Sequence, residues 1–310
     1  MEMTVGICEA APLLGRLVAR VIASAGAKPR LFDRVEQLVD AANSRQIQLA
    51  GVRGERLPEI LPCLDNGSTQ LLVWASEVGP DQLELAAADE RVNHLFGLRY
   101  PDGPPRSWEL LSTTRRRASG QPPPLGAELS WGAEVARFTP ATSADRDAVV
   151  AEVARLVRAL GGRRLADGLA EVAHELLMNA MYDAPVDGEG RPRFAHDRTA
   201  AVELAEGERP TFVFGVDGAK VVLSVSDPFG RLERGAVFGG LHRALASGTV
   251  DDSGGGAGLG LMVIFRACTL LFFDVIPGRM TKVTAVLELD VPQRELRRLP
   301  RSVHFARMEG

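Results

Sequence analysis

Short apolar runs alternate with helical patterns through the first third of the chain. The runs lie at residues 5–8, 30–32, 47–50, 71–74 and 94–98. Between them, segments such as 13–25 and 35–42 place apolar residues at helical spacing. Brief apolar runs separated by helices are typical of parallel strands buried on both faces. Residues 1–112 are therefore predicted to form an α/β domain with a doubly wound parallel sheet, whose functional edge lies at the carboxyl ends of the strands.

The stretch 113–142 separates this pattern from the second half of the chain. Three arginines are followed by the triple proline at 122–124 and then by further glycine, threonine and proline positions. Triple proline favours extended polyproline geometry and cannot lie inside a helix. We therefore predict a Pro/Gly-rich linker at 113–142, a second domain at 143–292 and a C-terminal tail at 293–310.

One helix of the second domain carries a row of polar residues beside its buried face. Apolar residues recur at three- and four-residue steps over 165–180, which predicts a buried helical stripe. Glu171, Glu175, Asn179 and Asp183 follow at four-residue steps on an adjacent stripe. Because residues four apart project to the same side of a helix, Glu175 and Asn179 can contact one ligand together. The same pattern also fits an amphipathic helix with a solvated edge.

A β-hairpin is predicted downstream of this helix. The runs 211–216 and 220–226 flank the turn dipeptide at 217–218, which tolerates positive φ. The second strand ends at Asp227, where a carboxylate is well placed to contact a ligand at the rim of the sheet. Asp-Pro also opens turns commonly, so the residue pair alone leaves both interpretations open.

A glycine-rich segment at 253–260 directly precedes an apolar run at 261–265. Its glycines let the backbone approach a ligand, and free amides at the start of a helix favour an anion. A flexible linker is the alternative, although linkers are not normally followed directly by a core helix. No lysine in the chain follows a glycine, which excludes the P-loop signature, and this segment does not fit G-x-G-x-x-G.

The order of these elements resembles the GHKL, or Bergerat, ATP-binding domain shared by gyrase, histidine kinases, mismatch-repair ATPases and anti-sigma serine kinases. The matching motifs are E-x-x-x-N at Glu175 and Asn179, G-x-G-L-G-L at 256–261, and G-x-x-T at Gly278 and Thr281. The resemblance covers about residues 143–290. It implies that the second domain is an α+β sandwich of GHKL/Bergerat type that binds ATP and Mg²⁺.

The resemblance also implies roles for individual residues. Asn179 would hold the magnesium ion, Asp227 would accept a hydrogen bond from the adenine amino group, and Glu175 would be the catalytic general base in members that turn over ATP. The other nucleotide-binding positions would be Asp183, Gly230, Gly256, Gly258, Leu259, Gly260 and Thr281. Magnesium prefers oxygen ligands and keeps several waters, so one amide oxygen with phosphate oxygens is chemically sufficient.

The first glycine box of the family, D-x-G-x-G, is altered here. Phe229 occupies the first glycine position and Arg231 the second. The phenyl ring either stacks on the base or partly fills its pocket. Residues 231–252 would form the lid over the nucleotide. His174 lies within the same helix as Glu175 and not on a separate dimerisation hairpin, so we do not expect it to be a phosphoacceptor.

The first domain resembles, in length and rhythm, the flavodoxin-like receiver domain of response regulators. Where receivers carry an acidic cluster after the first strand, this chain has Glu9 alone. Its predicted third strand leads to 50–52 without an aspartate, and Arg99 follows the fifth strand where receivers have lysine. Ser76 matches the family's hydroxyl position. We expect a pseudo-receiver that binds protein or forms a homodimer; an unrelated small α/β domain is the alternative.

Composition limits the remaining function classes. The chain is 45% hydrophobic and 25% charged with a net charge of -4, an ordinary globular composition with no general electrostatic attraction for nucleic acid. Its three cysteines are widely spaced and form no disulfide or zinc pattern. No apolar run approaches the roughly 18 residues of a membrane span, and the first residues lack a secretory signal. We therefore expect a cytoplasmic protein.

These features together predict a signalling protein related to two-component systems. It would bind Mg-ATP and either phosphorylate or regulate a partner protein. The alternatives are a non-catalytic, pseudokinase-like binding module in which ATP changes partner affinity, and a degenerate domain that binds no nucleotide. The intact Glu175 favours an enzyme, whereas the altered first glycine box favours a binding module.

Overall fold

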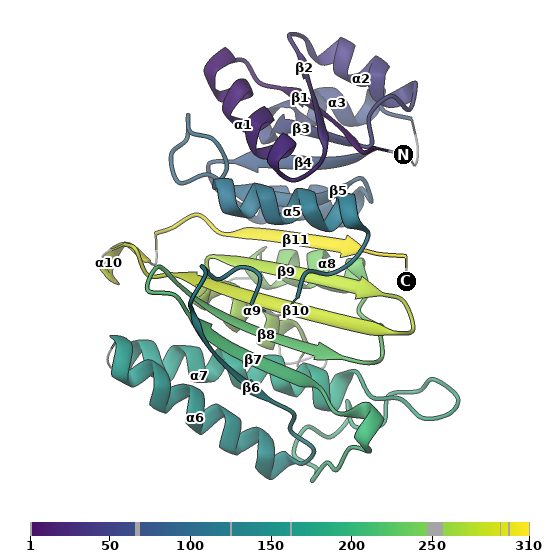
Figure 1. The fold of residues 1–310 in the computed structure, drawn as a ribbon. Helices are drawn as coiled ribbons and strands as arrows, with labels where there is room; N and C mark the ends of the chain where they lie inside the picture. Colours follow the sequence, from purple (N-terminus) through teal and green to yellow (C-terminus); the bar gives the residue numbers. More distant parts are fainter. Residues whose placement is uncertain are drawn as a thin grey trace. The chain divides into compact units, whose positions relative to one another are not determined.

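The computed structural model has a mixed α/β fold that divides into two compact units (Figure 1). The structure describes residues 2–65, 69–124, 126–161, 163–246, 257–291, 293–296 and 298–309. Unit 1 consists of Met1–Pro123 and Pro300–Ala306, and unit 2 of Pro124–Leu299 and Arg307–Gly310. The mixed α/β class expected from the sequence is therefore confirmed.

Unit 1 alternates strands and helices along the chain. Its elements are β1 (Thr4–Cys8), α1 (Pro12–Ser24), β2 (Lys28–Phe32), α2 (Val35–Asn43), β3 (Leu49–Arg53), α3 (Leu57–Ile60), β4 (Gln70–Ala75), α4 (Pro80–Ala88), β5 (Val92–Gly97) and α5 (Ser107–Ser119), with β11 (Ser302–Arg307) added from the end of the chain. The strands lie in the order β2-β1-β3-β4-β5-β11. Neighbours from β2 to β5 are parallel, and β11 runs antiparallel to β5.

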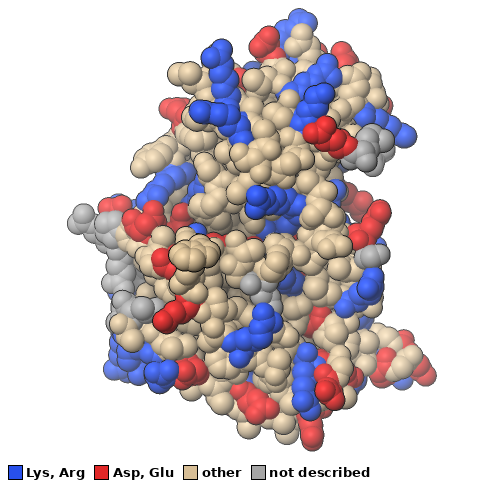
Figure 2. Space-filling model, in the orientation of Figure 1, with Lys and Arg blue, Asp and Glu red and all other residues tan. Residues whose placement is uncertain are grey.

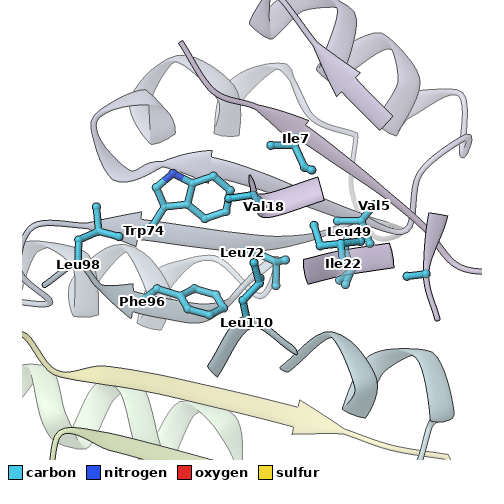
Figure 3. Packing of buried hydrophobic residues seen from close by; sticks show 11 residues of the cluster. Val5, Ile7, Val18, Ile22, Leu49, Leu72, Trp74, Phe96, Leu98 and Leu110 are labelled. Carbon is cyan, nitrogen blue, oxygen red and sulfur yellow. The ribbon is translucent and has the colours of Figure 1, made fainter. Parts of the chain in front are cut away.

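An apolar cluster packs strand residues of this sheet against α1 and α5 (Figure 3). Strand residues such as Ile7, Leu72 and Phe96 meet Ile22 of α1 and Leu110 of α5. Each of these side chains is at most 1% exposed. Burial of strand residues beneath helices explains why the runs of β1 and β4 are almost continuously apolar.

Unit 2 is built on an antiparallel sheet with four longer helices. Its elements are β6 (Glu134–Phe138), α6 (Ser143–Gly161), α7 (Arg163–Met178), the π-helical segment η3 (Asn179–Asp183), β7 (Thr211–Val216), β8 (Lys220–Asp227), α8 (Arg234–Ala246), α9 (Ala257–Ala267), β9 (Leu270–Ile276), β10 (Met280–Glu288) and α10 (Gln293–Leu296). The strand order is β9-β10-β8-β7-β6, and every neighbouring pair is antiparallel. Helix α7 packs against α6, α9 and β8, which places it at the centre of the unit.

Two segments expected to lack regular structure contain strands. The predicted linker at 113–142 includes the end of α5 and all of β6, and the predicted tail at 293–310 includes β11. Strand β6 is an edge strand with only partial burial, so its apolar alternation is weak. Strand β11 is buried, with Val303 paired to Leu95, but this pairing joins distant parts of the chain and leaves no local signal.

Charged residues of both signs are interspersed on the face shown in Figure 2, which gives that face no broad single-sign surface. Within the described residues, no helix has the length and apolar character needed to cross a bilayer.

Candidate functional site

Helix α7 ends by widening into the π-helical segment η3. The Ala184 N–H donates to the Asn179 carbonyl oxygen at 3.0 Å, the five-residue spacing of a π turn. The side chain of Tyr182 anchors this segment, since its hydroxyl donates to the Ala200 carbonyl oxygen at 2.9 Å. Single π turns inside α-helices frequently mark functional sites. Here the turn carries two of the polar residues that the sequence analysis selected, Asn179 and Asp183.

The arginine Arg198 lies among the predicted site residues. Its Nη2 donates to Asn179 Oδ1 at 3.1 Å and also to the Asp183 carboxylate. Its Nη1 lies 3.9 Å from Glu175 Oε2. One guanidinium therefore joins three of the four polar residues that the sequence places at four-residue steps, all except Glu171. Arg198 was missed by the sequence analysis, because it lies in an irregular segment and no spacing links it to α7.

Glu175 lies at the contact between α7 and α9. A Cβ atom added at Gly260 would collide with the Glu175 carboxylate, which would have to shift to admit it. Within the described residues, Glu175 Oε2 is buried and accepts no hydrogen bond. Burial raises the pKa of Glu175, and the positive charge of Arg198 opposes this effect. The carboxyl group is therefore poised to hold a proton more readily than an exposed glutamate.

The second glycine box is helical where the structure describes it. Helix α9 begins at Ala257, so Gly258, Leu259 and Gly260 lie in its first turn and not in a loop before it. Gly256 lies outside the described residues. In the predicted lid at 231–252, α8 occupies Arg234–Ala246, and 247–252 lie outside the described residues.

A second cluster forms at the end of strand β8. Asp227 is 6% exposed and lies opposite Thr281 of β10 in the antiparallel register. Its Oδ1 accepts a hydrogen bond from the Phe229 N–H at 3.0 Å. Gly230 has φ +62°, and a Cβ there would strike the Ile276 carbonyl oxygen. Thr281, which is far from Asp227 and Gly230 in sequence, is therefore brought next to them.

Burial raises the pKa of Asp227 to about 6. Hydrogen bonds from the backbone of Phe229, Gly230 and Thr281, and from the Thr281 side chain, act in the opposite direction. At neutral pH the group is mainly ionised and can accept a hydrogen bond. Strand β8, which ends at this residue, also contacts η3, so the same strand connects the two clusters.

The oxygen atoms around Arg198 fit a hard cation in chemistry and position. Asn179 Oδ1 and the Asp183 carboxylate both approach Arg198 Nη2, so they converge on one point. Amide and carboxylate oxygens are the ligands that Mg²⁺ prefers. Among the described residues, no group of three or more His, Cys, Asp or Glu residues could hold a metal. A cation here would therefore need further oxygens from a ligand or from water.

Unit 1 contains a related pairing at the carboxyl ends of β1 and β3. Glu9 Oε2 accepts hydrogen bonds from Arg53 Nε at 2.9 Å and from Trp74 Nε1 at 3.2 Å. Arg53 also donates to the carbonyl oxygens of Pro101 and Gly103. The sequence analysis missed Arg53, because it ended the third strand too early. The acid after the first strand is thus neutralised by an arginine at the end of the third.

Comparison with known proteins leaves the family open. No protein-family model matches the chain, and no curated protein matches it. Among solved structures, the chain is similar to one chain in the crystal structure of the SiaB-SiaC complex from Pseudomonas aeruginosa. The sequence identity is 16%, the match covers 49% of this chain and 88% of that chain, and the TM-score is 0.33. A likeness this weak carries no functional argument.

Because Gly260 contacts Glu175, we expect alanine substitution to affect stability differently at Gly260 and at Gly168, another helical glycine. Gly260→Ala should leave unit 2 less stable than Gly168→Ala does, because its Cβ would displace the Glu175 carboxylate. Gly168→Ala, in α7, should be neutral or stabilise by up to about 1 kcal/mol, since its Cβ meets nothing within 4 Å. Urea unfolding measures both. Equal effects of the two substitutions would contradict the described contact.

The raised pKa of Asp227 predicts a specific pH dependence of stability. Its folded-state pKa of about 6 exceeds its ordinary value of 3.8, so its stabilising contribution is present below pH 4 and is lost as pH rises through 6. Asp227→Asn should remove this loss of stability. At about 1.4 kcal/mol per pKa unit, the loss amounts to up to about 3 kcal/mol. The free energy of unfolding should be measured for both proteins from pH 4 to pH 7. A difference between them that is independent of pH would show that Asp227 keeps an ordinary pKa.

Proposed function

We propose that unit 2 is a GHKL-like domain that binds Mg-ATP, and that the protein uses it to phosphorylate or regulate a partner protein in signalling. The observation that carries the proposal is the convergence of Glu175, Asn179 and Asp183 on one position beside the first turn of α9. The family resemblance assigns the general base to Glu175, metal binding to Asn179 and nucleotide binding to Asn179 and Asp183.

The arrangement around the site supports this proposal. An antiparallel sheet and a layer of helices make up unit 2, as expected for an α+β sandwich. Asp227 stands at a strand end with Gly230 and Thr281 against it, where the resemblance expects the adenine to lie. A largely ionised Asp227 at pH 7 is suited to accept a hydrogen bond from an exocyclic amino group.

Asn179 and Asp183 would hold the magnesium ion, which when bound neutralises charge on the phosphates. Glu175 would accept the proton of an attacking hydroxyl or water. A general base works best when its pKa lies near the operating pH, and burial moves the pKa of Glu175 in that direction. The first turn of α9 would present its N–H groups to the phosphates.

Binding without turnover is the second candidate function, and two observations favour it. Phe229 is partly buried at the position of the family's first glycine, next to Asp227. Arg198 lies close to Glu175, and a nearby positive charge makes a carboxylate a weaker base. In this case ATP would change partner affinity without losing its terminal phosphate.

For unit 1 we propose a pseudo-receiver that binds protein or pairs with a second copy. The strand order β2-β1-β3-β4-β5 is the order of flavodoxin-like sheets. Strand β3 ends at Arg53 and not at an aspartate, and Arg53 already neutralises Glu9. This pairing supports a domain that receives no phosphoryl group.

Mg-ATP should stabilise the protein through Asn179. At ten times the dissociation constant, a ligand stabilises by about 1.4 kcal/mol, which raises the melting temperature by a few degrees. Asn179→Ala should abolish this rise, whereas Asp187→Ala, at an exposed turn in the same unit, should preserve it. Differential scanning fluorimetry with millimolar Mg-ATP provides the measurement. A folded wild-type protein without any shift would reject nucleotide binding.

Glu175→Gln separates the two candidate functions. If the protein is an enzyme, this substitution should lower phosphate release or transfer by at least about 100-fold, because general-base assistance is lost. The ATP-dependent rise in melting temperature should remain. Equal turnover by both proteins would reject Glu175 as the base, and absent turnover in the wild type with ATP binding intact would favour the binding module.

A further inference from the structure

Arg198 is held in place by its own surroundings. The segments on both sides of Arg198 are bonded to other parts of unit 2. Arg193 forms an ion pair with Glu208, and the Ala200 carbonyl oxygen accepts a hydrogen bond from Tyr182. Two residues further on, the Val202 N–H donates to Ser143 Oγ at 2.8 Å. These contacts fix the backbone that positions the Arg198 guanidinium at the end of α7. The Arg198 side chain is 23% exposed.

A divalent cation and Arg198 compete for the same oxygen atoms. Nη2 is hydrogen-bonded to both Asn179 Oδ1 and Asp183, the oxygens that fit a hard cation. The guanidinium stays positively charged at any accessible pH. Two cations on shared oxygens repel strongly where solvent screening is incomplete. A metal ion can bind these oxygens only after Arg198 has moved away from them.

We propose that Arg198 is an internal cation that excludes free divalent metal from Asn179 and Asp183. This inference deepens the proposed function and rests on it for the identity of the ligand. Metal that arrives with a nucleotide brings anionic phosphate oxygens, which can accept hydrogen bonds from the displaced guanidinium. Metal alone brings no such acceptor. The site is therefore selective for a metal-nucleotide complex over the free ion.

The test measures binding of Mn²⁺ alone to the full chain by electron paramagnetic resonance. Arg198→Met keeps the aliphatic length of the side chain and removes its charge. It should bind Mn²⁺ at least about tenfold more tightly than the wild type, since the competing cation is gone. Arg191→Met is the matched control, because it removes a positive charge from the same segment and Arg191 forms its described ion pairs with Asp187 and Glu189. It should match the wild type.

Two further variants identify the site of the gained affinity. Arg198→Lys keeps the positive charge and should show a much smaller gain than Arg198→Met. The double variant Arg198→Met/Asp183→Asn should lose the gain, because it removes one of the metal's oxygen ligands. Equal Mn²⁺ affinity of wild type and Arg198→Met, with or without detectable binding, would overturn the proposal, as would a gain that persists in the double variant.

A parallel titration with ATP distinguishes this proposal from the proposed function. Tighter Mn²⁺ binding by Arg198→Met in a protein that never binds ATP would support the internal cation and reject the nucleotide site. ATP binding by all variants, without any gain in Mn²⁺ affinity, would reject the internal cation alone. Melting temperatures of the variants confirm that each is folded.

Discussion

The charge balance at the end of α7 is the constraint on which the site depends. Glu175 at the end of α7 and Asn179 and Asp183 in η3 lie beside the face of α7 that is buried in its own unit. Two acids this close to each other and to apolar packing need a positive charge, and Arg198 provides it. The same crowding explains Gly260, because a side chain there would occupy the space of the Glu175 carboxylate.

In unit 1, too, an arginine neutralises an acid that is largely buried. Glu9 is 5% exposed at the sheet edge where a receiver would collect acids around a metal, and Arg53 neutralises it from the end of β3. In both units an arginine thus lies beside partly buried acids. In unit 1 the described partners of Arg53 are Glu9 and the carbonyl oxygens of Pro101 and Gly103, whereas in unit 2 an amide and two acids surround the arginine.

Local periodicity predicted the strands of unit 1 and the polar row on α7, because both depend on spacing within one element. It also placed Asp227 at a strand end. Periodicity could not predict contacts between distant segments. The hydrogen bond from Arg198 to Asn179 and the pairing of β11 with β5 leave no pattern within either segment. The glycine box was expected as a loop, but Gly258 and Gly260 are helical, since packing of α9 against α7 outweighs the low helix propensity of glycine.

The most direct test of the central claim is a crystal structure of the full chain with Mg²⁺ and a non-hydrolysable ATP analogue. We predict that the metal lies on Asn179 Oδ1, that the adenine amino group lies at Asp227, and that Arg198 is displaced from Asn179 and Asp183 toward the phosphates. A nucleotide bound elsewhere, or a metal-nucleotide complex at this site with Arg198 still bonded to both residues, would contradict it.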